Sequence, residues 1–414
     1  MAAQGTHTIQ PFELERYFSK HEFTAKYLAC CSDCEPVSVK ELLALADADG
    51  LQRWENMVLG YTETQGLPAL REEVARMYRT IKPSEVVVLA PEEGIYLTMR
   101  ALLQPGDHVV VTYPGYQSLY EIALSIGCEV ELWEPKLGPG GALKFEVETL
   151  QLLLQPNTRL LITNFPHNPT GYMPSAADWA IVTAACQSCG AYLFSDEMYR
   201  LMEYDPADRL PAAVDVYRKS ISLAGVSKAF GLPGLRIGWV ATHDSDLLKR
   251  ILELKDYTSI CPPAPSEILA LIALRAQSTL LQRNLSIIRS NLQVSVSSSR
   301  WDFGQLFEWQ EPKAGSIAFP RITFEEPIGV FTDLLVQTTG VLLLPATIYD
   351  HPPTSDLGHF RLGLGRRNLP ECLNQLAKPL RQVLEAAAES GVAVSGLGGD
   401  ASDGSSMAKH CVIS

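Results

Sequence analysis

The sequence predicts an α/β protein, with a large domain built on a mostly parallel sheet that carries helices on both faces, and a smaller α+β domain. Apolar, strand-like runs alternate with helical patterns through the middle of the 414-residue chain, which is typical of parallel sheets. From about residue 295 the pattern changes to three strand-like runs and one helix. A content of 46% hydrophobic and 20% charged residues is typical of globular proteins.

Seven strand-like runs are expected to form the large sheet. They are Glu85–Ala90, His108–Thr112, Cys128–Leu132, Arg159–Thr163, Tyr192–Asp196, Ser220–Ala224 and Ile237–Ala241. Helical patterns such as Glu92–Leu103 and Ser175–Cys189 lie between most of them. Ligands of such sheets bind at the carboxyl ends of the strands, so residues with a chemical role should follow the strands directly.

The chain is expected to divide into four segments. We expect an N-terminal segment (1–57) that packs with the small domain, a large domain (58–294), a small domain (295–388) and a flexible tail (389–414) rich in Gly, Ser and Asp. The elements expected in the small domain are strands at Ser316–Ile322, Val341–Pro345 and His359–Leu364 and a helix at Leu369–Ala388.

The charge balance and the absence of targeting signals restrict the partners. With 34 basic and 47 acidic residues the net charge is −13, which argues against nucleic acid as a partner. No apolar run reaches the roughly 18 residues of a membrane span, and no secretory signal is visible. We therefore expect a cytoplasmic protein whose nine cysteines are thiols.

Two CxxC pairs, Cys31–Cys34 and Cys186–Cys189, could together supply four zinc ligands. The second pair lies in a helical pattern that ends at Gly190, where a spacing of three residues is usual for core packing. The long separation of the two pairs is also unlike a zinc ribbon, so we expect no metal site.

A lysine follows the strand that ends near Ala224, in GVSKAFGLPGLRIGW (Gly225–Trp239). A buried ammonium is costly, and one good reason to place Lys228 there is Schiff-base chemistry with an aldehyde. Arg236 offers a permanent cation with a planar fork that suits phosphate. The alternative is a surface lysine before a glycine-rich loop.

Two further motifs follow neighbouring strands. NFPHNPTG (Asn164–Gly171) forms a tight turn in which the Asn168 amide can donate a hydrogen bond. In YLFSDEMYR, Asp196 ends an apolar strand, and a carboxylate there can keep a pyridine nitrogen protonated. Tyr199 lies three residues later, in reach of the same ligand. The alternative for Asp196 is a helix N-cap.

This ordered set resembles the fold-type-I aminotransferases that depend on pyridoxal 5′-phosphate (PLP), in the class I/II branch, from about residue 58 to residue 385. The resemblance implies a homodimer that transfers an amino group between an amino acid and a 2-oxo acid. Within it, Lys228 is the lysine that holds the cofactor and moves the α-proton, and Asp196 is the partner of the pyridine nitrogen. Asn168 and Tyr199 are ligands of the phenolic oxygen, and Tyr116 stacks on the ring.

The same resemblance assigns the phosphate and the substrate. It implies that Arg236 binds the phosphate, that Tyr61 contacts the phosphate of the neighbouring subunit, and that Arg361 clamps the substrate's α-carboxylate, with Asn168 beside it. A bidentate arginine is the expected chemistry for a carboxylate.

The sequence departs from the family pattern at the phosphate loop. The loop reads Ala90–Pro91–Glu92, where the family usually has small residues whose backbone N–H groups bind phosphate, and Pro91 has no N–H. Gly225 stands where the family often has Ser or Thr, and Ser222 or Ser227 could compensate.

The N-terminal substrate loop departs as well, because it contains Asp33 and Glu35 in place of glycines. Two carboxylates near the substrate would favour a cationic side chain, and the alternative is a solvated acidic loop. Several motifs, including KDYTSI, are similar to capreomycidine synthases, which cyclise a hydroxylated arginine with PLP. Elimination or cyclisation of an arginine derivative is therefore the alternative to amino-group transfer.

Two other function classes receive little support. A PLP-binding regulator would normally carry a DNA-binding domain, and no segment is left for one. A nicotinamide-binding oxidoreductase would need a G-x-G-x-x-G motif after the first strand, which this sequence lacks.

The chain ends in Cys411-Val412-Ile413-Ser414, which fits a farnesylation signal. A single lipid chain gives weak, reversible membrane binding, so we expect weak membrane association if Cys411 is prenylated. Basic residues are almost absent upstream, and an unmodified terminus is the alternative.

Overall fold

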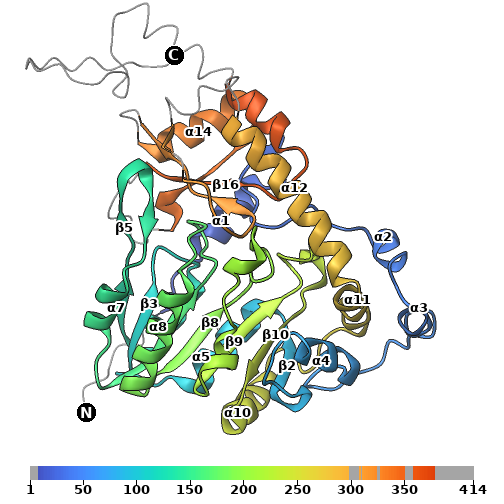
Figure 1. Cartoon of the computed structure of the whole chain (residues 1–414). Coiled ribbons are helices and arrows are strands. Elements are labelled where there is room, and N and C mark those ends of the chain that lie inside the picture. Colours follow the sequence, from blue (N-terminus) through green and yellow to red (C-terminus); the bar gives the residue numbers. More distant parts are fainter. Residues whose placement is uncertain (1–7, 298–306, 309, 324–326, 350–357, 378–414) are drawn as a thin grey trace, which may run out of the picture.

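A seven-stranded sheet forms the centre of the large domain (Figure 1). The computed structural model describes residues 8–297, 307–308, 310–323, 327–349 and 358–377. In spatial order the strands are β2 (Val86–Leu89), β10 (Gly238–Thr242), β9 (Ser220–Gly225), β8 (Tyr192–Asp196), β7 (Thr158–Asn164), β3 (His108–Thr112) and β4 (Glu129–Trp133). Strand β10 runs opposite to the other six strands of this sheet. The predicted mostly parallel sheet is confirmed, and each predicted strand ends within one residue of the observed one.

Helices cover both faces of the sheet, because strand residues alternate between two apolar cores. Val87 and Leu89 pack in one core, and Val86 and Val88 in the other. The first face carries α5 (Pro91–Leu102), α6 (Ser118–Ile126) and α10 (Ser245–Lys255). The second carries α4 (Pro68–Ala75), α7 (Val147–Leu153), α8 (Ala176–Cys189), α9 (Ala213–Val216) and α11 (Ala264–Arg275).

Helix α8 shows how local sequence sets the bounds of these helices. The Ser175 side chain accepts a hydrogen bond from the Asp178 amide at its start, and Gly190 ends it in a left-handed conformation with φ 73°. Cys186 lies in the apolar core and Cys189 is half-buried, as expected for core packing. The described residues contain no group of three or more side chains that could hold a metal ion.

The small domain follows the long helix α12 (Gln277–Ser297) and contains α14 (Ile328–Thr339), a helix at 369–377 and short strands. The strands are β11 (Phe307–Glu308), β12 (Ile317–Ala318), β13 (Arg321–Ile322), β14 (Val341–Leu342), β15 (Leu344–Pro345) and β16 (Phe360–Gly363). The single strand expected at Ser316–Ile322 is split into β12 and β13. Pro320 lies between them and has no N–H for a continuous ladder.

The N-terminal segment divides between the two domains. Helix α1 (Glu13–His21) and strand β1 (Tyr27–Leu28) join the small domain, where β1 pairs with β14 and the Tyr17 hydroxyl donates to the carbonyl of Leu343. Helices α2 (Val39–Leu43) and α3 (Ala48–Glu55) instead pack on α11 of the large domain. The first part of the N-terminal segment thus contacts residues near 341–343, and its second part contacts α11.

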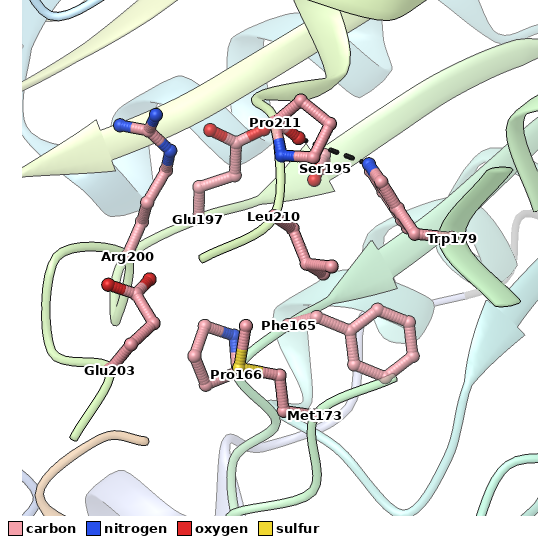
Figure 2. Close-up of a pocket in the computed structure, with 10 residues that line it drawn as sticks. All are labelled: Phe165, Pro166, Met173, Trp179, Ser195, Glu197, Arg200, Glu203, Leu210 and Pro211. Carbon is pink, nitrogen blue, oxygen red and sulfur yellow. Dashed lines mark hydrogen bonds between the residues drawn. The ribbon is translucent and has the colours of Figure 1, made fainter. Parts of the chain in front are cut away.

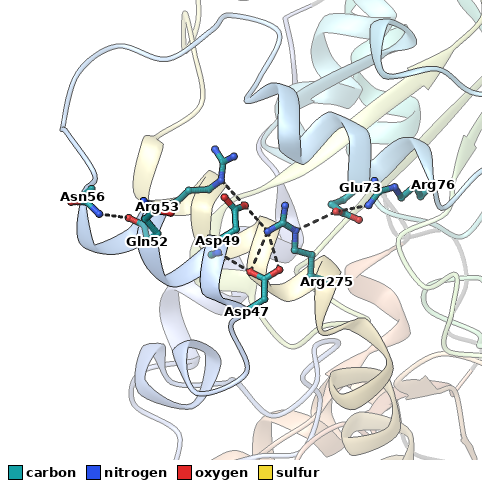
Figure 3. A network of polar contacts seen from close by, with 9 residues as sticks. Asp47, Asp49, Gln52, Arg53, Asn56, Glu73, Arg76 and Arg275 are labelled. Atoms are coloured by element: carbon teal, nitrogen blue, oxygen red, sulfur yellow. Dashed lines mark hydrogen bonds and ion pairs between the residues drawn. The ribbon is translucent and has the colours of Figure 1, made fainter.

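A polar network fixes α3 to α4 and α11 (Figure 3). Arg275, at the end of α11, donates to Asp47 at 3.1 Å, to Asp49 at 2.8 Å and to Glu73 of α4 at 3.2 Å. One partly exposed arginine that serves three carboxylates stabilises more than isolated surface pairs do. The network holds the segment that leads to Tyr61.

Two remaining elements complete the description. Strands β5 (Lys136–Leu137) and β6 (Leu143–Lys144) form a separate hairpin. None of the helices in the described part of the chain has the length and apolarity needed to cross a membrane.

Candidate active site

Several of the predicted site residues follow strands that end at one edge of the sheet. Strands β7, β8 and β9 are parallel and end at Asn164, Asp196 and Gly225, so the residues that follow them meet at the same edge. Burial raises the pKa of the Asp196 carboxyl, and Lys228 lies close enough to oppose this shift. The antiparallel strand β10 begins at this edge, directly after the predicted phosphate ligand Arg236.

Lys228 is held by a residue from the other end of the chain. Its Nζ atom donates to Oγ of Ser32 at 2.8 Å. Burial lowers the pKa of Lys228, and the nearby Asp33 carboxylate opposes this shift. A lysine with a lowered pKa has more free amine at neutral pH, which is the form that attacks an aldehyde.

Asp196 is buried beside this lysine. One oxygen accepts a hydrogen bond from the Met198 amide at 3.0 Å, and burial raises the pKa of the carboxyl to about 7. A turn follows Asp196 in place of a helix, so the N-cap alternative is wrong. A buried carboxylate is stabilised by a cationic partner, and a protonated pyridine would be one.

Arg361 and Asn168 form a buried polar cluster with Tyr349. Nη1 of Arg361 donates to the Tyr349 hydroxyl at 2.6 Å and to Oδ1 of Asn168 at 3.2 Å, and Nε donates to the Cys30 carbonyl at 3.0 Å. Nη2 makes no hydrogen bond within the described residues. The arginine is 1% exposed and fixed on one side, which leaves a preorganised donor for a carboxylate.

Two buried hydroxyl groups at this site have no hydrogen-bond partner of good geometry among the described residues. They belong to Tyr199 and Ser227, and both side chains are almost fully buried. Tyr199 faces Arg361, Ser32 and Asp196. Buried polar groups are normally paired, so these two atoms indicate that a ligand completes the site.

The ring-stacking candidate Tyr116 lies under the N-terminal helix. Its hydroxyl donates to Oε1 of Glu15 at 3.2 Å, and its ring centre lies 4.9 Å from that of Phe12. Burial raises its pKa far above the usual value. Tyr116 is therefore neutral and apolar-packed, as a stacking residue should be.

Pro91 and Gly225, two departures from the family pattern, lie against each other. A Cβ atom at Gly225 would lie 3.2 Å from Cγ of Pro91, and one at Gly238 would lie 2.8 Å from it. The proline ring takes the space that a side chain at Gly225 would need. Ser222 cannot substitute, because its hydroxyl donates to Oε1 of Glu197 at 2.7 Å, whereas the Ser227 hydroxyl remains free.

Glu92 introduces a second acid beside this loop. Its Oε2 accepts a hydrogen bond from Ser118 at 3.2 Å, and burial raises its pKa to about 7. Much of Glu92 is therefore neutral near pH 7, which limits its repulsion of an anion at the start of α5.

Arg236 and Tyr61 lie on the surface of the single chain. Arg236 is exposed, has φ 55° and donates to the Pro233 carbonyl at 3.1 Å, yet it affects the pKa of Glu92. Tyr61 is 92% exposed and makes no hydrogen bond or ring contact with any residue of the described ranges. Its exposure is compatible with a role in another subunit.

The two acids of the N-terminal loop already have partners. Asp33 is buried and forms a bidentate pair with Arg366, with hydrogen bonds of 2.9 to 3.2 Å. Oε2 of Glu35 accepts from the backbone amide of Arg367 at 3.0 Å. A solvated acidic loop is therefore wrong for Asp33, which joins the loop to the small domain.

Three contact residues were not predicted from the sequence. Ser32 precedes Asp33 in the N-terminal substrate loop, so its place in the sequence could have indicated a role in the site. Tyr349 and Phe18 had none, since their contacts depend on how the small domain and α1 fold over the sheet. The Phe18 ring centre lies 5.7 Å from Cζ of Arg361.

A small cavity is lined by Ser195 and Glu197, the two chain neighbours of Asp196, and by none of the predicted site residues (Figure 2). It is lined by residues that include Ser195, Glu197 and Arg200, and its space of about 10 Å³ is close to that of one water molecule. Oε2 of Glu197 and Nε of Arg200 have no hydrogen-bond partner among the described residues. The cavity is too small for a cofactor.

Residues 42–365 match the family model for class I and II aminotransferases. The chain belongs to this family. Its cofactor is PLP, and it is a transaminase that transfers an amino group between an amino acid and a 2-oxo acid. The buried acid, the lysine and the free hydroxyls described above fit that cofactor.

Known proteins resemble nearly the whole chain. Capreomycidine synthase of Streptomyces vinaceus is 27% identical over 357 residues, which cover 86% of this chain and 90% of that protein. A PLP-dependent aminotransferase from Streptococcus suis has a TM-score of 0.81 and 29% identity, covering 91% of this chain and 98% of its own. The PLP-dependent cyclase OrfR has a TM-score of 0.79 and 25% identity, covering 92% and 100%.

Proposed function

We propose that Lys228 is the residue that holds PLP and moves the proton between the substrate's Cα and the cofactor. The observation that carries this proposal is the position of its amine, which lies at the sheet edge with a lowered pKa and a hydrogen bond to Ser32. Bound PLP supplies an electron sink that stabilises negative charge at Cα. Asp196 would maintain that sink by keeping the pyridine nitrogen protonated.

The remaining residues would orient the two ligands. The Tyr199 hydroxyl and the Asn168 amide would donate to the phenolic oxygen, and Tyr116 would stack on the ring. Arg361 would hold the substrate's α-carboxylate with its free Nη2 group, in a site where Asn168 and Tyr349 already fix the guanidinium plane. Fixed orientation of both ligands brings the α-proton within reach of Lys228.

The phosphate would be bound at the start of α5. The Ser227 hydroxyl, Arg236 and the backbone after Pro91 would form this site, with Glu92 at its edge. Pro91 supplies no N–H, so the free Ser227 hydroxyl is the donor that compensates.

The second subunit of a homodimer would complete the site through Tyr61. Its exposure in the single chain supports this proposal. Mixing inactive Lys228→Ala and Tyr61→Ala proteins under exchange conditions should restore activity, because one mixed site then has both residues. No recovery would contradict a shared site.

Cyclisation or elimination of an arginine derivative is the second candidate reaction. It is favoured by the resemblance to capreomycidine synthase and to a PLP-dependent cyclase across the whole chain. The site residues serve both reactions, because each begins with removal of the α-proton. In a single turnover with an amino acid, release of one equivalent of 2-oxo acid indicates transfer, and a cyclic product or a lost β-substituent indicates the alternative.

Three further expectations from the sequence are carried forward as proposals. The division into a large domain (58–294) and a small domain (295–388) remains our proposal. Cytoplasmic localisation and the prenylation of Cys411 remain predictions, and Cys411 is outside the described residues. Intact-mass measurement of protein from its native cells tests the prenylation, since an unmodified terminus would refute it.

A further inference from the structure

One face of helix α1 borders the active site. Glu15, Phe18 and Glu22 are three and seven residues apart and therefore lie on the same side of the helix, where Glu22 continues the helical conformation as its C-cap. Glu15 accepts a hydrogen bond from Tyr116 at 3.2 Å, and the Phe18 ring packs 5.7 Å from Cζ of Arg361. These two contacts direct the face toward the mouth of the site.

Glu22 is the carboxylate on this face that has no partner. Its residue is half-buried, and its side chain makes no hydrogen bond or ion pair with the residues that the structure describes. Burial, and then Asp33 and Glu15, raise its pKa, whereas Arg366 and Lys228 oppose the shift. Glu22 follows Phe18 by about one helical turn, so it lies on the face of α1 that packs against Arg361.

The cations around this space have other partners. Arg366 is paired with Asp33, Lys228 bonds to the cofactor, and Arg361 would bind the α-carboxylate of the substrate. Once the cofactor and the α-carboxylate are bound, Glu22 has no counter-charge left within the described chain. A partly buried carboxylate is stabilised when a cation arrives.

A separate feature, a buried hydroxyl group, points to a ligand that binds in this space. The Tyr199 hydroxyl is buried, has no partner of good geometry and faces Arg361, Ser32 and Asp33. The site thus presents an amine, a carboxylate clamp and an unpaired acid, in addition to a free hydroxyl.

We propose that the enzyme selects amino acids whose side chain ends in a cation, and that Glu22 of α1 is the carboxylate that receives it. This inference rests on the proposed function of Lys228 and Arg361. Glu15 adds a second negative charge at the mouth and holds Tyr116. Asp33 and Glu35 were expected to contact a cationic substrate side chain, but both are already bound within the chain. We therefore assign this contact to Glu22 of α1.

The test compares arginine with citrulline, its neutral isostere, and lysine with norleucine. The rate of the first half-reaction and the equilibrium binding of each amino acid are measured on the holoenzyme through the absorbance of the cofactor. The wild-type enzyme should prefer each cationic amino acid by at least about tenfold, the scale of one charged hydrogen bond. Glu22→Gln should remove most of that preference by weakening the binding of arginine, with citrulline unchanged.

Glu55→Gln is the matched control, because Glu55 is exposed at the end of α3 and unpaired in the described chain. It should keep the wild-type preference. Equal binding of arginine and citrulline by the wild-type enzyme would overturn the inference even if the Glu22 variant did not fold. An equal effect of Glu22→Gln on both amino acids would also overturn it. If no amino acid changed the cofactor's absorbance, the proposed function would fail, which is a distinct outcome.

Discussion

The Nζ atom of Lys228 donates a hydrogen bond to Oγ of Ser32 across 2.8 Å, so the end of β9 is joined to the N-terminal loop. The carbonyl of Ser32 in turn accepts from the Ser316 hydroxyl at 2.6 Å, in the small domain. Three distant parts of the chain therefore determine where the amine lies. Ser32 acts through Lys228 and is a positioning residue.

Replacing Ser32 by alanine should lower kcat by about tenfold, with little change in KM, because the amine loses one hydrogen-bond partner worth about 1.4 kcal/mol. Steady-state kinetics with the best amino acid would measure both constants. Ser32→Thr keeps the hydroxyl and should recover much of the rate. A rise in KM alone would show that Ser32 contributes to substrate binding and not to the position of the lysine.

The Asp33–Arg366 pair should matter for stability more than for specificity. Asp33→Asn removes a carboxylate from a bidentate pair that is mostly buried, and the guanidinium of Arg366 is left without its anion. We expect the free energy of unfolding to fall by about 1–3 kcal/mol, below the cost for a fully buried pair because Arg366 is partly exposed. Thermal unfolding measures this loss.

Asp33→Asn also tests whether Asp33 or Glu22 determines the preference for a cationic substrate. Its preference for arginine over citrulline should stay at the wild-type value. A lost preference with unchanged thermal stability would return the substrate-binding role to Asp33.

Pro91 and Gly225 lie close together, so the effects of their substitutions on the free energy of unfolding should not be additive. Gly225→Ser should destabilise the protein, because its Cβ would lie 3.2 Å from Cγ of Pro91 and 3.0 Å from the backbone of β10. In a Pro91→Ala background the loss should be smaller by about 0.5 kcal/mol or more, the usual coupling of residues in contact. The backbone contact remains, so relief is partial. Purely additive losses in denaturant unfolding would contradict the account.

The raised pKa of Asp196 predicts a pH dependence of the apoprotein. Its pKa rises from 3.8 to about 7 in the folded chain, so stability that is present below the unfolded pKa is lost as the pH rises through 7. Asp196→Asn has no such proton to lose. The Tm of the apo variant, relative to wild type, should therefore increase between about pH 4 and pH 7 and change little above that.

With PLP bound, the wild-type protein should instead have the higher Tm above pH 7. The pyridine nitrogen then gives the ionised Asp196 a cationic partner, which Asp196→Asn cannot use. Glu92 titrates in the same range and its pKa is raised in part by the Asp196 charge, so the two proteins are compared in a Glu92→Gln background. A difference in Tm that did not change with pH would show that Asp196 is not the group that titrates.

The large sheet could be predicted almost residue by residue, because its buried strands are short apolar runs between turns. The residues that follow β7, β8 and β9 could be placed at one edge for the same reason. The expected order of the strands was therefore enough to predict that Asn168, Asp196 and Lys228 lie close together.

The acid near the substrate could not be assigned in this way. Asp33 and Glu35 were visible as unusual residues in a loop, but their partners, Arg366 and Arg367, lie more than 300 residues away in the chain. Glu22 was hidden in an ordinary amphipathic helix, and only the contacts of Glu15 and Phe18 show which way that helix faces. Long-range packing of this kind has no local sequence signal.

The most direct test is to treat the PLP-loaded enzyme with borohydride, which fixes the cofactor to its lysine, and to map the modified peptide by mass spectrometry. The account predicts one cofactor group per chain, on Lys228, and no fixed cofactor and no turnover in Lys228→Ala. Modification of another lysine, or normal turnover by the Lys228→Ala variant, would contradict it.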